Sequence, residues 1–466
     1  MRILAFSINP LFPDKVSGGA SKHLENLAAY LARQGHEVSV LCTQPQTGPM
    51  EFATRDGYLV KAVLPFHQPF PQPYAIAPGE LAEIYRSISA VLEQTDRFYI
   101  HDGELLIPRG FSPVPVISSF RDNFYPESIL GSFLSQADEI IAVSPYSAAV
   151  LAASAGSFLE GFRSRLHQFN NGLDSDFYKP SETLDLSAKL LKGHAQAWPI
   201  LLHPHRAEPG KGLEETIKLA RRLLQDPGYK DLRVLVPSGM RVMQGEAETD
   251  FLKACRKTIA EAGLEEHFVF HPWLSVEETP AYYSLGDLTI CLGTVPEAFG
   301  NVAYESLLCG TPSLVYRIGT HRSQLPDRFL LKASPLDIDG AAQLAANALR
   351  ARKRISEAER AGIAAYFDAQ NQLEGYARVI TGAEKREPLT FINPEKAASL
   401  PLGLAPWCII EGRRVYHDYD ARWYSAKDLA GLDILINELD QDGCVRSSAS
   451  TAGFLRMGIL APMPEL

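Results

Sequence analysis

The chain alternates short apolar runs of strand length with longer stretches of helical period. In the first 45 residues "RILAFSI" is a β-rich run, "SGGA" interrupts it, and "GHEVSVLCT" resumes as a strand. Between these strands Leu24, Leu27, Ala28 and Leu31 recur at helical spacing. A strand, a glycine turn, a helix and a second strand predict a parallel βαβ unit with a right-handed crossover.

The same alternation continues and then starts again, which predicts two α/β domains. "RFYIHD", "VPVISSF" and "ADEIIAVS" extend the first series, which we assign to residues 1–180. A second series runs from "WPILLHPHR" through "DLTICLG" to "PSLVYR", within residues 181–385, and its last helix is expected to pack back on the first domain. We therefore predict two doubly wound, Rossmann-like domains facing a cleft, with a ligand at the carboxyl ends of their strands.

The end of the chain has a different character. Residues 386–405 are proline-rich and are expected to be a linker. Residues 406–466 contain short strand-like runs and one helical stretch, "AGLDILINELDQDG", which predict a small accessory α+β or winged-helix-like domain. Two roles stay open for it: docking a protein or peptide along a strand edge, or packing as an appendage that stabilises the fold or a dimer.

Composition narrows the class of protein. The chain has 466 residues, 46% of them apolar, and a formal net charge of −10, which argues against a mainly electrostatic nucleic-acid binder. No apolar run is long enough to suggest a membrane span, and the N-terminus lacks a signal-peptide pattern. Six scattered cysteines without a C-x-x-C pair predict reduced thiols in a cytoplasmic protein.

Candidate chemistry begins in the stretch "HPHRAEPGKGLEETI". Arg206 and Lys211 follow a predicted strand, on a Gly/Pro loop that leads into a helix. The planar guanidinium and the compact ammonium suit phosphate oxygens, and a helix N-terminus adds backbone amides. The two side chains could therefore neutralise a diphosphate without a metal ion; the alternative is two solvated surface cations.

A second stretch, "GTVPEAFGNVAYESLLCGTP", carries two carboxylates eight positions apart. Glu297 precedes the small-residue turn Phe299-Gly300-Asn301, and Glu305 lies in the helix that follows. At this separation the carboxylates do not share a proton, and they suit two ends of one hydroxyl-rich ligand. The alternatives are a Glu297 that complements the helix dipole and a Glu305 that is a partly exposed helical residue.

With these motifs the chain resembles the retaining glycosyltransferases of the GT-B fold, of the family 4 (group 1) type. The resemblance covers roughly residues 1–385 and also includes "SGGA", "ADEIIAVSPYS" and "NNGLDSDFYKP". It implies a hexosyltransferase that moves a sugar from a nucleotide-diphosphate-sugar, most simply a UDP-sugar, to an acceptor hydroxyl with retention. It implies no metal and no other cofactor, and as partners a nucleotide sugar and an acceptor that is a glycan, lipid, peptide or small molecule, but no nucleic acid.

The resemblance also implies roles for single positions. Arg206 and Lys211 match the basic pair that holds the diphosphate, Glu297 the carboxylate that binds hydroxyls of the transferred sugar, and Glu305 the carboxylate that binds the ribose. Arg206, Lys211 and Glu297 are therefore the expected catalytic residues. The other implied donor-binding positions, which would act through a loop or its backbone amides, are Gly18, Gly19, Phe299, Gly300 and Asn301.

One position departs from the family pattern. In "SSFRDNFYP" Arg121 and Asp122 stand where the family often has a histidine, so Arg121 becomes a candidate contact to an anionic sugar, acceptor or phosphate. The alternative is an ion pair with Asp122 within the loop. His101 is expected to line the acceptor side or a turn, and His23 to be a helix surface residue.

Competing interpretations remain at two levels. Three Asp-x-Asp pairs resemble the metal-binding pair of another transferase fold, but Asp174 and Asp176 follow an Asn-Gly turn signal and are interpreted as turn residues. At the level of function, the alternatives are a non-catalytic glycan- or partner-binding protein on a GT-B scaffold and a nucleotide-sugar epimerase of the same fold. The epimerase would need acid/base groups on both sides of the sugar ring.

Overall fold

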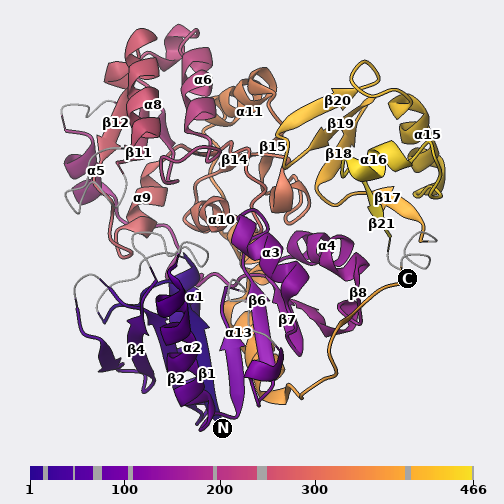
Figure 1. Cartoon of the computed structure of the whole chain (residues 1–466). Helices are drawn as coiled ribbons and strands as arrows, with labels where there is room; N and C mark the ends of the chain where they lie inside the picture. Colours follow the sequence, from indigo (N-terminus) through magenta and orange to yellow (C-terminus); the bar gives the residue numbers. More distant parts are fainter. Residues whose placement is uncertain are drawn as a thin grey trace. The chain divides into compact units, whose positions relative to one another are not determined.

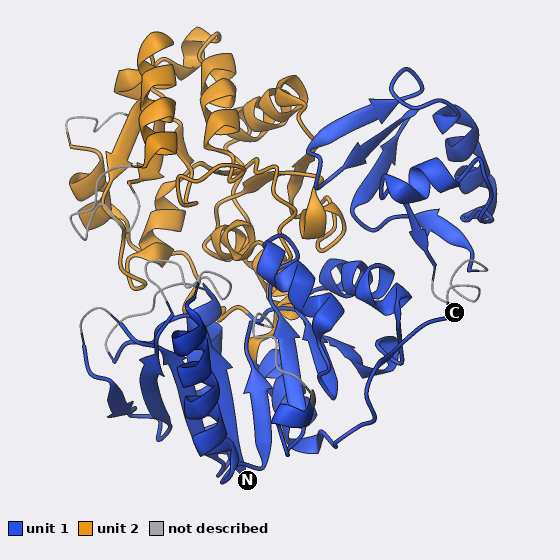
Figure 2. Ribbon diagram, viewed as in Figure 1, with its two compact units in different colours: residues 1–172, 370–466 blue, residues 173–369 orange. Residues whose placement is uncertain are grey.

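The computed structural model describes residues 1–13, 19–45, 48–66, 76–102, 109–192, 197–238, 249–393 and 400–463. The chain forms two compact units (Figure 2). Unit 1 comprises Met1–Gly172 and Gln370–Leu466, and unit 2 comprises Leu173–Ala369. The domain limits predicted at residues 180, 385 and 405 stay predictions.

Unit 1 is built on an eight-stranded sheet with the order β3-β4-β2-β1-β5-β6-β7-β9 (Figure 1). All neighbouring strands are parallel except β3 and β4, which form an antiparallel pair at one edge. The strand order reverses between β1 and β5, which is the switch point of a doubly wound sheet. The strands are β1 (Arg2–Ser7), β2 (Glu37–Thr43), β3 (Glu51–Ala53), β4 (Leu59–Leu64), β5 (Arg97–Ile100), β6 (Val116–Phe120), β7 (Glu139–Ala142) and β9 (Leu166–Gln168).

Helices pack on both faces of this sheet. Leu24 and Leu27 of α1 share one buried core with Tyr376 of α13, while Ile84 of α2 and Leu151 of α4 belong to a second core. The central strands are buried along nearly their whole length, as expected for parallel strands covered on both faces. The helices are α1 (Gly19–Arg33), α2 (Pro78–Leu92), α3 (Pro126–Leu134), α4 (Pro145–Ala153) and α13 (Ala369–Gly382).

Unit 2 contains a six-stranded, fully parallel sheet with the order β12-β11-β10-β13-β14-β15. Its switch point lies between β10 and β13. The strands are β10 (Ile200–Leu202), β11 (Arg233–Pro237), β12 (Phe268–His271), β13 (Leu288–Cys291), β14 (Ser313–Tyr316) and β15 (Leu331–Ala333). The helices are α5 (Leu184–Leu190), α6 (Leu213–Leu223), α8 (Asp250–Glu261), α9 (Thr279–Leu285), α10 (Asn301–Leu308), α11 (Ile338–Arg350) and α12 (Glu357–Tyr366).

The chain that follows α13 remains attached to unit 1. The Lys385 ammonium lies 3.4 Å from the Asp138 carboxylate, and the Leu389 amide donates to Gln136 at 2.9 Å. A short strand, β16 (Thr390–Phe391), then pairs with β8 (Leu159–Glu160). These contacts fix the beginning of the C-terminal segment on the first sheet domain.

Residues 400–463 form a small α+β part with its own apolar core. Three antiparallel strands, β18-β19-β20, are followed by two helices, and β17 pairs with β21. The elements are β17 (Leu402–Leu404), β18 (Cys408–Glu411), β19 (Arg414–His417), β20 (Arg422–Ser425), α15 (Leu432–Asp442), α16 (Ala452–Arg456) and β21 (Leu460–Pro462).

The predicted fold class is confirmed: two doubly wound parallel α/β sheets and a small C-terminal α+β part are present. All six cysteines are free thiols, and five of them are buried. Within the described ranges, no helix combines the length and the apolar character that a membrane crossing requires.

Candidate functional site at the carboxyl edge of the parallel sheets

In unit 2 the loops after β10 and β13 meet at the switch point of the sheet. The Gly210 carbonyl accepts from the amides of Thr294 and Val295 at 2.9 and 3.3 Å. Gly212 has φ +91°, and a Cβ there would lie 2.7 Å from the Leu292 carbonyl carbon. Glycine at this position therefore allows the two loops to touch along their backbones.

The contact of these loops brings together two of the predicted catalytic residues. Lys211 Nζ lies 2.6 Å from Glu297 Oε1, although the residues are 86 positions apart. Their side chains are 17% and 28% exposed, so both are shielded but reachable from solvent. Burial alone would raise the pKa of Glu297, but the neighbouring Lys211 charge, followed by His205, lowers it to about 2. Glu297 is therefore a carboxylate at neutral pH.

Two histidines that the sequence analysis missed border this ion pair. Burial lowers the pKa of His205 and of His321 to about 4, even though the Glu297 carboxylate acts in the opposite direction. The His321 Nδ1 atom lies 3.1 Å from the Tyr304 hydroxyl. Both imidazoles are therefore neutral at pH 7, and they can orient hydrogen bonds without adding charge.

Arg206 lies on the same loop as Lys211 but has a different partner. Its guanidinium is 3.3 Å from the Glu208 carboxylate, and both side chains are about one-third exposed. The Glu208 carbonyl in turn accepts from the Lys211 amide at 3.2 Å. The structure thus places the predicted basic pair on one compact loop, with Arg206 at its more exposed end.

The turn before α10 presents backbone atoms rather than side chains. Gly300 has φ +77° and is the residue that precedes the first helical residue, Asn301. A Cβ on Gly300 would overlap the His321 ring. The Phe299 side chain is 3% exposed and packs edge-on against two aromatic rings, with centroid distances of 5.2 and 5.1 Å. A ligand at this turn would therefore meet the amides at the start of α10.

Glu305 lies within α10, about one turn from the helix start, and has an aromatic partner. The Tyr283 hydroxyl donates to Glu305 Oε2 at 2.8 Å. Burial, and then the Glu305 charge, raise the pKa of Tyr283 far above its ordinary value, so the phenol keeps its proton and remains a donor. The role of Tyr283 as the partner of Glu305 depends on the packing of α9 against α10.

Unit 1 places Arg121 just after β6, at the carboxyl edge of its own sheet. Its guanidinium donates to His23 Nδ1 and to Asn171 Oδ1, both at 3.0 Å, and to the Tyr376 hydroxyl at 3.5 Å. The alternative ion pair with Asp122 is not present, because the Asp122 carboxylate accepts from the next turn of its own loop. These three partners of Arg121 are neutral groups.

Two histidines lie next to this arginine: His23 contacts it directly, and His101 stacks on His23. His23 is 8% exposed, so the prediction of a helix surface residue is wrong: α13 covers this face of α1, and the His23 ring meets Tyr376 edge-on at 4.8 Å. His101 Nε2 faces the Ala20 carbonyl at 2.9 Å, while its Nδ1 faces the Tyr99 hydroxyl. Burial, followed by the Arg121 charge, lowers the pKa of both histidines well below the ordinary value.

Two other predicted features are the glycine loop of the first domain and the turn at Asp174. Gly19 is the first residue of α1, and Gly18 lies outside the described residues. The Asp174 carboxylate accepts from the amides of Asp176 and Phe177, both at 3.0 Å, and so closes its own turn.

Comparison with known families gives two matches along the chain. Residues 17–177 match the model "Glycosyltransferase Family 4", and residues 192–366 match "Glycosyl transferases group 1". Together the two models cover most of the chain. Apart from β1, the strands of the two large sheets fall within the matched ranges, whereas the C-terminal α+β part lies beyond them.

Individual proteins are similar to parts of the chain. A D-inositol 3-phosphate glycosyltransferase of Mycobacterium sp. (strain JLS) is 30% identical over 159 residues, which cover 34% of this chain and 33% of that protein. The chain spans about a third of the length of the curated relatives it matches.

Two solved structures share the fold over most of their length. Sucrose-phosphate synthase from Thermosynechococcus elongatus has a TM-score of 0.67 at 16% identity, covering 82% of this chain and 98% of that one. Anabaena HepE in complex with UDP-glucose has a TM-score of 0.62 at 19% identity, covering 82% and 100%. With the two family matches, the chain belongs to the group 1, family 4 glycosyltransferases of the GT-B fold.

Proposed function

We propose that the protein transfers a sugar from a nucleoside-diphosphate donor, a UDP-sugar, to an acceptor hydroxyl with retention of the anomeric configuration. The observation that carries this proposal is the Lys211–Glu297 ion pair at the switch point of unit 2. It lies on loops joined through their backbones, and the turn that follows Glu297 leads into the N-terminus of α10. The fold that the chain shares with HepE, which was solved with UDP-glucose, supports this choice of donor.

Departure of the nucleoside diphosphate is the step that this site would assist. Negative charge grows on the leaving phosphate, so fixed positive charge nearby lowers the barrier. The Lys211 ammonium has three N–H donors, one of which is directed to Glu297. Arg206 on the same loop and the first amides of α10 would add to this stabilisation.

Glu297 would position the transferred sugar rather than exchange protons with it. With a pKa of about 2 it remains ionised, and a carboxylate accepts hydrogen bonds from sugar hydroxyls. The neighbouring imidazoles, His205 and His321, are neutral at pH 7 and would need a pH near 4 to become acids. We therefore assign deprotonation of the acceptor to an oxygen of the leaving phosphate, which favours attack on the same face of the sugar.

Arg121 would contact an anionic group of the acceptor. Its three hydrogen-bond partners in unit 1 are neutral, so its positive charge is not cancelled by them. Several curated relatives carry the phosphorylated compound D-inositol 3-phosphate in their names, which agrees with an anionic acceptor.

A panel of nucleotide sugars tests the proposed activity. UDP-glucose, ADP-glucose and GDP-mannose are compared by thermal shift in the presence of excess EDTA, and products are identified by mass spectrometry. We expect stabilisation by UDP-glucose, and loss of that stabilisation in Lys211→Met. Lys218→Met is the matched control, because Lys218 is an exposed lysine on the adjoining helix, paired with Glu215.

Other outcomes would overturn the proposal in distinguishable ways. Binding of every donor without turnover in the presence of a broad acceptor library would favour a binding protein. Release of an altered nucleotide sugar would favour an epimerase. Equal UDP affinity in wild type and Lys211→Met would contradict the site, and a strict requirement for Mg²⁺ or Mn²⁺ would contradict a metal-independent mechanism.

A further inference from the structure

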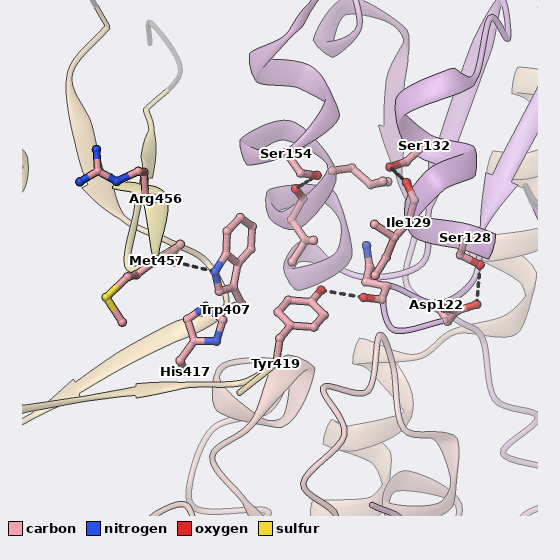
Figure 3. Close-up of a pocket in the computed structure, with 14 residues that line it drawn as sticks. Asp122, Ser128, Ile129, Ser132, Ser154, Trp407, His417, Tyr419, Arg456 and Met457 are labelled. Carbon is pink, nitrogen blue, oxygen red and sulfur yellow. Dashed lines mark hydrogen bonds between the residues drawn. The ribbon is translucent and has the colours of Figure 1, made fainter. Parts of the chain in front are cut away.

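A cavity of about 350 Å³ lies where the C-terminal α+β part covers the first sheet domain, within unit 1. Its walls come from the loop after β6, from α3 and α4, and from the C-terminal part. Figure 3 shows Trp407, His417 and Tyr419 on the C-terminal side, opposite Ser128, Ser132 and Ser154. The volume falls in the range of small-molecule sites and equals that of roughly a dozen water molecules.

Two direct contacts hold the C-terminal part over this cavity. The Tyr419 hydroxyl donates to the Asn123 carbonyl at 2.6 Å, and the Tyr146 hydroxyl donates to the Asp418 carboxylate at 3.2 Å. Asp418 is 1% exposed. The cavity is therefore a built feature of the junction, which both parts of unit 1 are needed to form.

The hydroxyl groups of the wall all direct their protons into the protein. Ser128 donates to Asp122 at 2.8 Å, Ser132 to the Ile129 carbonyl at 2.7 Å, and Ser154 to the Val150 carbonyl at 2.6 Å. Tyr419 donates to the Asn123 carbonyl in the same way. A hydroxyl that has used its proton still has lone pairs, so the wall presents acceptors and favours a ligand rich in donors.

Asn123 adds a side-chain amide whose oxygen has no partner within the protein. It lines the cavity and is 4% exposed, and its side-chain Oδ1 atom lacks a hydrogen-bond partner. A buried amide oxygen without a donor is uncommon in folded proteins. That oxygen has almost no accessible surface, so it marks a polar group buried behind the wall and not an atom that a ligand in the cavity contacts.

The aromatic residues supply the complementary apolar surface. The Trp407 and Tyr419 rings are 6.0 Å apart at 70°, and the indole N–H is directed to the Gly458 carbonyl at 2.7 Å. The polar atoms of both rings are thus bonded within the protein, and their carbon atoms form the apolar part of the lining. A pyranose ring has C–H groups on its faces and hydroxyls around its edge, so it can stack on an aromatic ring while its edge donates hydrogen bonds.

The charges of the wall favour a neutral ligand. Among the lining residues, the carboxylate of Asp122 accepts from two backbone amides at 3.0 Å and from the Ser128 hydroxyl, so most of its accepting capacity is used. Arg456 contributes one positive charge, which opposes an ammonium ligand. A phosphate group offers only acceptors, and it would face a wall made mainly of acceptors, which disfavours a phosphorylated ligand.

We propose that this cavity is a second carbohydrate site that binds one or two rings of a neutral saccharide, separate from the donor site of unit 2. This inference does not depend on the transferase activity, since it concerns binding alone. It gives the C-terminal part a function: its aromatic side chains complete a sugar-binding wall that the first sheet domain begins.

Ligand-observed NMR on the full chain tests the proposal with three defined probes: D-glucose, D-mannose and maltose. We expect saturation transfer to at least one probe, with a Kd of about 1–10 mM, which suits a small neutral ligand. Saturating UDP is expected to leave the signal unchanged. Absence of transfer to all three probes, or displacement of the probe by UDP, would overturn the proposal.

Two variants on α3 test whether the saccharide binds in this cavity. Ile129 lines the cavity on α3 and is 38% exposed, so Ile129→Trp can fill the space without disturbing the core, and it should weaken binding at least tenfold. Leu130→Trp is the matched control, because Leu130 is 44% exposed on the same helix and is not a lining residue. Equal binding by both variants would contradict the assignment.

A second variant separates binding from folding. Because the Asn123 amide oxygen has no partner in the protein, Asn123→Leu should not lower the thermal midpoint. The same substitution should weaken probe binding severalfold, because it replaces an amide that lines the cavity with an apolar side chain. A variant that binds the probes as well as wild type, or that loses binding only together with its fold, counts against the proposal.

Discussion

The two α/β sheets share one winding pattern but arrange polar groups differently at their carboxyl edges. In unit 2 a permanent ion pair, Lys211 with Glu297, is supported by glycine-containing loops whose backbones touch. In unit 1 a single guanidinium, that of Arg121, is held by neutral side-chain acceptors. The comparison shows how one scaffold supports two kinds of polar edge: an ion pair fixed on backbone turns, and a cation with neutral partners. In our proposal the first stabilises a departing diphosphate and the second contacts the acceptor.

The largest expected effect comes from the charge in unit 2. Lys211→Met should lower kcat of sugar transfer about a hundredfold, because it removes a donor aimed at the developing charge. It also leaves a partly buried carboxylate unpaired, which should cost about 1–3 kcal/mol of stability. Steady-state kinetics and thermal unfolding measure the two effects, and Lys211→Met combined with Glu297→Gln should recover stability but not activity. Recovery of activity would contradict the assigned roles.

The glycine turns of unit 2 should be the next most sensitive feature. Gly300→Ala places a Cβ at φ +77° and against the His321 ring, so the free energy of unfolding should fall by about 1–3 kcal/mol, together with donor affinity. Gly263→Ala is the matched control, since Gly263 also has positive φ but open space around it. Chemical denaturation and UDP titration distinguish them, and equal losses in both variants would show that crowding at His321 is unimportant.

Loss of the Arg121 cation at the carboxyl edge of the unit 1 sheet should reduce sugar transfer less than loss of the ion pair in unit 2. Arg121→Gln should reduce transfer about tenfold, the magnitude expected for one charge-assisted hydrogen bond. If Arg121 contacts an anionic acceptor, the loss should appear mainly in KM for the acceptor, while the Kd for UDP stays unchanged. A change confined to UDP binding would show that Arg121 contacts the donor and not the acceptor.

The pH dependence of stability should be the smallest effect. The pKa of His321 is about 4 in the folded protein and 6.5 in the ordinary state, so the unfolded chain binds more protons between these values. Stability is therefore complete above pH 6.5 and is lost as the pH falls toward 4. His321→Gln should reduce the slope of the free energy of unfolding against pH by about 1 kcal/mol per pH unit. Denaturation at several pH values from 6.5 to 4.5 measures this slope. An unchanged slope would show that the His321 imidazole is not held neutral in the folded protein.

Sequence patterns were sufficient to predict the fold class and some of the candidate site residues. The period of the apolar residues predicted both parallel sheets, and glycine loops after predicted strands pointed to Arg206 and Lys211. The rule that ligands bind where the strand order reverses then explains why the loops of Lys211 and Glu297 meet. Their 2.6 Å contact could not be derived, because it depends on the register of β10 against β13.

Other features depend on packing between distant segments. His23 is buried because α13, which follows the whole of the second sheet in the sequence, packs beside α1. The acceptor wall of the cavity requires Tyr419 to reach the Asn123 carbonyl, a contact across 296 positions. By contrast, the Arg121–Asp122 alternative failed for a local reason: a carboxylate after a strand satisfies the amides of its own turn first.

A crystal structure of the protein with UDP tests the central claim most directly. The account predicts that the diphosphate lies at the carboxyl edge of the unit 2 sheet, with a phosphate oxygen within hydrogen-bond distance of Lys211 Nζ and of the first amides of α10. A diphosphate bound away from the loops that follow β10 and β13 would contradict it.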